Sequence, residues 1–155
     1  MKGYSFQNYD SKKMARAKAN YAPISMKTTY EVLRLIRGRN LDQAVTMLGE
    51  VKEAKRPVAF LKYRKDVPHR KGDGLSIGRF PRKVSIELIE LLTLVKANAK
   101  EKGLKEDALI IIHAAVNSGP NLWHYGRIRR RRRKSCHVEV VVQEKEQKKK
   151  EVKKK

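Results

Sequence analysis

The sequence predicts an α+β fold in which three helices precede two strands that pair antiparallel across a long connection. Apolar residues recur at helical spacing in three segments between residues 26 and 103. Two segments of β type follow, one almost wholly apolar and one alternating. The stretch between them has about nineteen residues, whereas an ordinary hairpin loop has about 2–5. We therefore expect this connection to project from the domain as an arm.

The first helix is predicted to begin after Ser25, a residue type that caps helix N-termini, and to end at Arg37, next to Gly38. The first fifteen residues show no clear period. A short edge strand is predicted at 21–24, where Pro23 would be tolerated. The helix predicted between Ser25 and Gly38 has one apolar face, which carries Thr29, Val32, Leu33 and Ile36.

A second helix can be capped by Asn40 or Asp42, and its apolar positions are Leu41, Val45, Leu48 and Val51. It ends before Pro57, because the residue that precedes a proline disfavours helix. Residues 58–80 then lose all periodicity and are rich in proline, glycine and basic residues. This composition predicts a long surface loop.

The third helix is predicted from Pro81 to near Gly103, with a regular apolar stripe of Val84, Leu88, Leu91, Leu92, Val95 and Ala99. Residues 108–116 are β-branched and nearly all apolar, which is typical of a central strand covered on both faces. We expect His113 within it to be a buried neutral imidazole with a hydrogen-bond partner. Residues 137–142 alternate as a half-buried strand, with Val138, Val140 and Val142 on one face and His137 and Glu139 on the other.

The charge of the chain indicates a polyanionic partner. Lys plus Arg total 38 against 16 Asp plus Glu, so the formal net charge of the 155 residues is +22. Repulsion of this size disfavours an isolated compact fold, and a bound polyanion would relieve it.

The length of the chain suits one domain. We expect residues 1–143 to form it, with the arm at about 117–135, and the lysine-rich residues 144–155 to be a disordered tail.

The predicted arm has the composition of a nucleic-acid contact. It contains no acidic residue, and seven of the eight residues at 127–134 are cationic. Arginine offers a planar fork of donors to phosphate. Trp123, His124 and Tyr125 add rings on which unpaired bases can stack, although Trp123 could instead pack against the arm itself.

Patterns for catalysis and metal binding are weak. Cys136 and His137 are adjacent, so on a strand they point to opposite faces and cannot form a nucleophile–base pair. His69, His113, His124 and Cys136 lack metal-ligand spacing, and Gly72, Gly74 and Gly78 match neither a P-loop nor a dinucleotide fingerprint. We predict no enzyme, no cofactor and no metal.

The longest apolar run is too short to span a bilayer, so no membrane partner is expected. The single cysteine fits a reducing compartment.

Short pieces in order along nearly the whole chain resemble one family. They are Tyr4-Ser5-Phe6-Gln7-Asn8, Met14-Ala15-Arg16-Ala17, Ile24-Ser25 with Lys27, Leu35-Ile36-Arg37-Gly38, Arg56-Pro57, Gly78-Arg79-Phe80-Pro81 with Lys83, Asn98-Ala99, Gly119-Pro120, Gly126-Arg127 and Cys136-His137-Val138-Glu139. The ordered set resembles the universal large-subunit ribosomal protein numbered twenty-two, in its archaeal and eukaryotic form, called seventeen in eukaryotes.

The resemblance implies three helices packed on a small antiparallel sheet, with a long protruding β-hairpin. It also implies a position near the exit of the nascent-peptide tunnel, with the hairpin threaded between rRNA segments toward the tunnel wall. The tunnel-proximal tip would be Asn121, Leu122, Trp123, His124, Tyr125 and Gly126. This chain departs from the family pattern in its shorter arm, in His124-Tyr125 where Arg-Ala is usual, and in Met26 where proline is common.

We therefore predict a structural, rRNA-binding constituent of the large ribosomal subunit, cytoplasmic and ribosome-bound. Its expected partners are large-subunit rRNA, neighbouring ribosomal proteins and the nascent peptide. The expected rRNA contacts are Arg127, Arg129, Arg130, Arg131, Arg132, Arg133 and Lys134 in the arm, with Lys62, Arg64, Lys65, Arg70, Lys71, Arg79, Arg82 and Lys83 outside it. The alternatives are a DNA- or chromatin-associated basic protein, which would bind duplex DNA as well, and an RNA-processing nuclease, which would turn RNA over.

Overall fold

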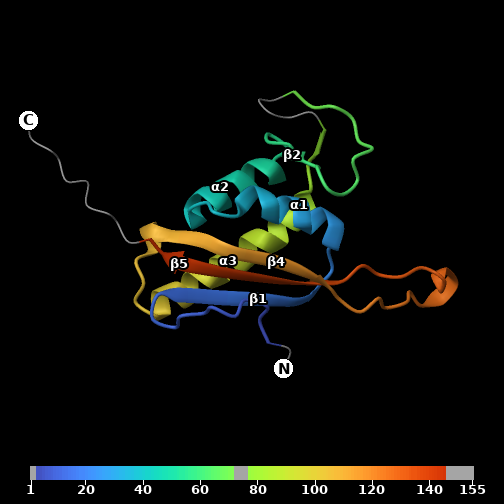
Figure 1. Ribbon diagram of the computed structural model, residues 1–155. Coiled ribbons are helices and arrows are strands. Elements are labelled where there is room, and N and C mark those ends of the chain that lie inside the picture. Colours follow the sequence, from blue (N-terminus) through green and yellow to red (C-terminus); the bar gives the residue numbers. More distant parts are fainter. Residues whose placement is uncertain (1–2, 72–76, 146–155) are drawn as a thin grey trace, which may run out of the picture.

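A three-stranded antiparallel sheet with helices on one face forms the body of the protein (Figure 1). The computed structural model describes residues 3–71 and 77–145. The elements in order are β1 (Met14–Ala22), α1 (Met26–Ile36), α2 (Leu41–Lys52), β2 (Val58–Ala59), β3 (Gly78–Arg79), α3 (Arg82–Glu101), the 3₁₀ turn η1 (Glu106–Ala108), β4 (Leu109–Ser118), the 3₁₀ turn η2 (Gly126–Ile128) and β5 (Cys136–Glu144). The predicted α+β class, with three helices on a small antiparallel sheet, is confirmed.

The three helices lie where their apolar stripes predicted them. α1 begins after Ser25, whose side chain makes no capping hydrogen bond, and ends just before Arg37 and Gly38. α3 begins one residue after Pro81 and not at it. The inner faces of the helices pack on the sheet through Leu33, Ile36, Leu48, Leu88, Leu92, Val95, Val138, Val140 and Val142, all of them fully or almost fully buried.

The first strand is longer and earlier than the sequence predicted. The edge strand expected at 21–24 exists but its bounds are wrong, because β1 is an edge strand that starts at Met14 and ends at Ala22. Along β1, Ala15 and Ala17 are buried against α3, whereas basic side chains alternate with them on the other face. Alanine is depleted in strands, so this alternation of small and basic residues did not indicate one. The helix contact accounts for it, because α3 approaches β1 closely only over side chains of this size.

The expected hairpin between the last two strands is confirmed, but their places in the sheet differ from the prediction. β4 and β5 pair antiparallel with Val116 opposite Val138. The strand order is β1-β5-β4, so β5 is central and β4 is an edge strand. The prediction that β4 is covered on both faces is therefore wrong, and Ile112 is exposed. β5 also extends through Glu144, whereas residues 146–155 of the predicted tail lie outside the described residues.

Residues 58–80 are not an unstructured surface loop, which corrects that prediction. β2 and β3 pair antiparallel, Phe60 is fully buried, and Val67 is almost fully buried. The carboxylate of Glu31 in α1, itself buried, accepts the backbone N–H groups of Leu61, Lys62 and Tyr63 at 3.4, 2.9 and 2.7 Å. These contacts join the start of the segment to the core. Residues 72–76, which include the predicted Gly72 and Gly74, lie outside the described residues.

Candidate nucleic-acid interface

The connection between β4 and β5 leaves the body of the protein as an arm, at the end of the sheet where β4 ends and β5 begins (Figure 1). At its base Gly119 N donates to Ser135 O at 3.0 Å. A Cβ at Gly119 would lie 2.6 Å from the Ser135 side-chain oxygen and 3.0 Å from its carbonyl carbon. Glycine is therefore required for the two chains to approach so closely.

Beyond its base the arm is held by a few hydrogen bonds and not by a continuous ladder. His124 N donates to Arg131 O at 2.8 Å, and Arg133 N donates to Leu122 O at 2.7 Å. Trp123 pairs with Arg132 as an isolated bridge. This register places the turn at η2, Gly126–Ile128, with Gly126 at a φ of 75°. Of the predicted tip residues only Gly126 lies in the turn, and residues 121–125 lie on the irregular segment that leads to it.

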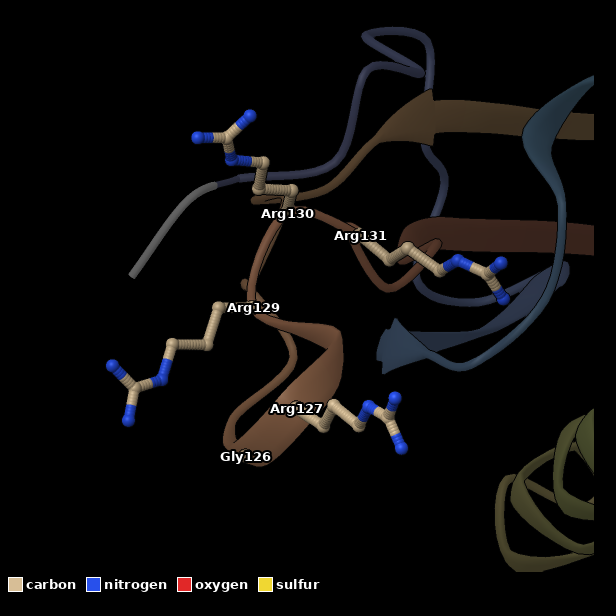
Figure 2. A pocket seen from close by; sticks show the side chains of 5 residues that line it. All are labelled: Gly126, Arg127, Arg129, Arg130 and Arg131. Carbon is tan, nitrogen blue, oxygen red and sulfur yellow. The ribbon is translucent and has the colours of Figure 1, made fainter.

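The arginines around the turn are exposed and point to two opposite sides of the arm (Figure 2). Figure 2 shows Arg129 and Arg130 directed to one side of the backbone and Arg127 and Arg131 to the other. Together with Gly126 they line an open hollow of about 760 Å³. In the described part of the chain, none of the seven cations at 127–134 forms an ion pair with a carboxylate. The arm therefore presents uncompensated positive charge to solvent.

The arm's aromatic rings stack on its own arginines but stay accessible. The guanidinium of Arg132 lies 4.2 Å from the centroid of the Trp123 ring, which is 55% exposed. Arg133 lies 5.4 Å from the Tyr125 ring, which is 84% exposed. Trp123 thus packs against the arm, as one interpretation of the sequence had it, and still leaves a surface for a base. Such cation–π pairs also fix the direction of the arginines.

The predicted cations outside the arm are all exposed, and some of them lie near its base. Arg82 and Lys83 at the start of α3 line the same groove as Lys134 of the arm, with a volume of about 350 Å³. Lys62 lies over the Tyr30 ring at 4.7 Å, and Arg70 over the Phe80 ring at 5.4 Å. The remaining predicted cations lie on the surface of the 58–80 segment: Arg64, Lys65, Lys71 and Arg79.

The sheet face opposite the helices carries a cation–aromatic ladder that the sequence did not predict. The guanidinium of Arg16 lies between the rings of Tyr4 and Tyr9, at 4.3 and 4.1 Å from their centroids. Lys18 Nζ lies 5.7 Å from the centroid of the Tyr4 ring, and Lys102 Nζ lies 5.0 Å from that of Tyr9. Burial raises the pKa of Tyr4. Two features of the sequence could have indicated this cluster: the alternation of small and basic residues along β1 and the aromatic residues near the N-terminus. Neither shows that Arg16 contacts Tyr4 and Tyr9, because only the fold brings these residues together.

A buried carboxylate fastens the N-terminal segment to this same face. Glu139, predicted to be on an open face, is 1% exposed and accepts hydrogen bonds from the backbone N–H and hydroxyl of Ser5. Its Oε1 also lies 3.1 Å from His113 Nε2, and the Phe6 ring packs on that imidazole. His113 thus has the predicted hydrogen-bond partner, although it is half-buried and not within a covered strand.

The residues considered for catalysis are kept apart. Cys136 is fully buried in the core, and this burial raises the pKa of its thiol. His137 lies on the opposite face of β5, as the alternation predicted. Within residues 3–71 and 77–145, no three His, Cys, Asp or Glu side chains gather where a metal ion could bind. No helix in these same ranges has the length and apolar character needed to cross a membrane.

The fold and the exposed surface define a small basic α+β protein, in which charge on a projecting arm is the main feature. The sequence model of the family described as Ribosomal protein L22p/L17e matches residues 17–143. The chain belongs to this family, and the resemblance found in the sequence is confirmed.

Relatives in three archaea cover most of the chain. The Large ribosomal subunit protein uL22 of Methanococcus aeolicus is 38% identical over 139 residues, which cover 86% of this chain and 91% of that protein. The protein of the same name from Staphylothermus marinus is 35% identical over 148 residues, covering 90% and 94%. That from Archaeoglobus fulgidus is 34% identical over 144 residues, covering 89% and 93%.

Proposed function

We propose that this chain is a structural component of the large ribosomal subunit and that it binds large-subunit rRNA through the arm and the cations near its base. Its archaeal relatives carry the name of a large-subunit protein. Ribosome-bound in the cytoplasm, it would have rRNA and neighbouring ribosomal proteins as partners. Residues 1–143 would act as one binding domain, with the lysines of 144–155 as additional phosphate neutralisers.

The observation that carries this proposal is the uncompensated charge of the arm. Residues 127–134 hold seven exposed cations, and none of them pairs with a carboxylate of residues 3–71 or 77–145. Alone in water such a segment repels itself. Phosphates on both sides would neutralise it, and the release of counterions would offset the entropy lost when the arm is ordered. Arginines that point to opposite sides, as in Figure 2, suit an arm surrounded by RNA.

The far end of the arm would extend toward the wall of the nascent-peptide tunnel. In this proposal the turn at Gly126–Ile128 reaches furthest, because the pairing of Trp123 with Arg132 centres the arm there. Residues 121–125 would then line one side of the arm just behind the turn, with Trp123 and Tyr125 available to stack on unpaired bases. A nascent peptide would meet the turn and not the predicted segment as a whole.

The salt dependence of rRNA binding tests the phosphate contacts. If the arm and its neighbours engage about ten phosphates, the slope of log K against log salt should lie near −7 to −9. We expect a measured slope steeper than about −5 for the purified chain on a large-subunit rRNA fragment. A slope of about −2 would correspond to two or three phosphate contacts and would contradict the proposed clamp.

Sedimentation of a cell extract tests the ribosomal role itself. The chain should migrate almost entirely with large subunits, because the proposed contacts are extensive, and digestion with ribonuclease should release it. Digestion with deoxyribonuclease serves as the control and should leave its position unchanged. A chain that is released by deoxyribonuclease instead would support the DNA-binding alternative, and RNA turnover by the purified chain would support the nuclease alternative.

A further inference from the structure

A polar groove at the root of the arm is distinct from the arginine surface described above. It lies on the sheet face opposite the helices and has a volume of about 690 Å³. Its walls come from the N-terminal segment, the end of β1, the end of β4 and the start of β5, through Tyr4, Lys18, Asn20, Tyr21, Asn117 and His137. None of these residues belongs to the predicted rRNA contacts. The groove exists only because three strands and the N-terminal segment meet there.

An irregularity in β1 turns an aromatic ring into this groove. The pairing of β1 with β5 shifts between Ala19 and Ala22, so that two residues lie opposite His137. One of them, Tyr21, has a φ of 57°, in the left-handed region that tyrosine rarely adopts. A bulge of this kind redirects side chains. As a result Tyr21 is 64% exposed although it lies at the end of a strand.

His137 packs against the Tyr21 ring, and the backbone N–H of Tyr21 orients the His137 imidazole. The two ring centroids lie 4.8 Å apart in a T-shaped arrangement, and Tyr21 N donates to His137 Nδ1 at 3.3 Å. With Nδ1 as acceptor, the neutral imidazole carries its proton on Nε2. The contact leaves most of the tyrosine ring open to solvent. The groove therefore has one aromatic wall and an additional N–H donor beside it.

The remaining walls combine amides with a single cation. Asn117 lies opposite His137 in the sheet register, and Asn20 lies in the bulge on the other side of it; both are exposed. An amide side chain can donate and accept at once, which suits the edge of a nucleobase. Lys18 Nζ donates to Gly3 O at 3.1 Å and has two further N–H groups. The nearby carboxylate of Glu139 is buried and already satisfied.

We propose that this groove binds one unpaired nucleotide of the RNA that the arm engages. The base stacks on Tyr21, Asn20 and Asn117 contact its edge, and Lys18 contacts a neighbouring phosphate. This inference rests on the proposed function, because the arm brings RNA to the groove. It adds a second mode of recognition: the arm binds phosphates of any RNA, whereas the groove selects a base that lies outside a helix.

Substitution of Tyr21 separates the two modes. The probes are a single-stranded RNA heptamer with one 2-aminopurine and an RNA duplex of the same length, each titrated with the full-length chain at 0.15 M salt. Tyr21→Asn removes the ring and keeps a residue type that tolerates the left-handed conformation. Stacking of one base predicts a loss of roughly 5- to 100-fold in affinity for the heptamer and less than about twofold for the duplex. The quenching of 2-aminopurine on binding should also be lost.

Two further variants keep the test decisive. Tyr21→Phe retains the ring and should bind both RNAs within about twofold of the wild type. Asn117→Leu, on another strand, should weaken binding of the heptamer but not of the duplex, and thermal unfolding checks that each variant is folded. If Tyr21→Asn weakens the binding of both RNAs equally, or of neither, the proposal that the groove binds an unpaired nucleotide is contradicted. If the large-subunit rRNA fragment binds with the steep salt slope expected above and only the discrimination between heptamer and duplex is missing, the proposed function stands without the groove. A shallow slope on that rRNA fragment would overturn the proposed function itself.

Discussion

Replacing the five arginines Arg129, Arg130, Arg131, Arg132 and Arg133 with glutamine should weaken rRNA binding about a thousandfold at 0.15 M salt. Each lost phosphate contact removes about 0.7–0.9 from the salt slope, so five contacts remove about 3.5–4.5. Extrapolated from 1 M to 0.15 M salt, that change is about three decades of affinity. The measurement is a titration of an rRNA fragment at several salt concentrations. Stability should hardly change, since all five arginine side chains are exposed.

The matched control removes the same charge elsewhere. Glutamine at Lys148, Lys149, Lys150, Lys153 and Lys154 also lowers the net charge by five. Lysine is a compact point charge without the planar fork that arginine offers to phosphate, so this variant should lose less affinity and less slope. An equal loss in the two variants would mean that net charge alone determines binding, and it would contradict a specific role for the arm.

Replacing Glu31 with alanine should lower the free energy of unfolding by about 3 kcal/mol, because three backbone N–H groups would lose a charged acceptor in a buried site. Glu31→Gln should cost less, about 1–2 kcal/mol, since its single carbonyl oxygen can still accept some of these bonds. Urea denaturation measures both losses. The amides of Lys62 and Tyr63 should exchange their hydrogens faster in both variants, which locates the effect in the 58–80 segment.

An exposed glutamate provides the comparison. Glu90 lies on the solvent face of α3, and Glu90→Ala should change stability by less than about 0.5 kcal/mol. If Glu31→Ala also changed it by less than about 1 kcal/mol, or left amide exchange of the 58–80 segment unaltered, the carboxylate would not be what anchors that segment. Lys62, Arg64 and Lys65 would then need another explanation for their positions.

The arm and the helices could be predicted because their signals are local. Val84, Leu88 and Leu92 recur along one face whatever they pack on. The uniform charge of residues 127–134 and the length of the connection exclude a short hairpin loop without any knowledge of the rest of the chain. Where the arm turns was not predictable in this way, because the pairing of Trp123 with Arg132, and not composition, places the turn.

The sequence by itself determined the class of fold, the basic arm and the family to which the chain belongs. Only the tertiary structure decided that β1 is a strand, that β5 is central and that Glu139 is buried, since each depends on a segment far away in the chain. Ser5 hydrogen-bonds to Glu139, and Tyr21 hydrogen-bonds to His137. Periodicity reports which face of an element is apolar, but it carries no information about which distant segment covers the other face.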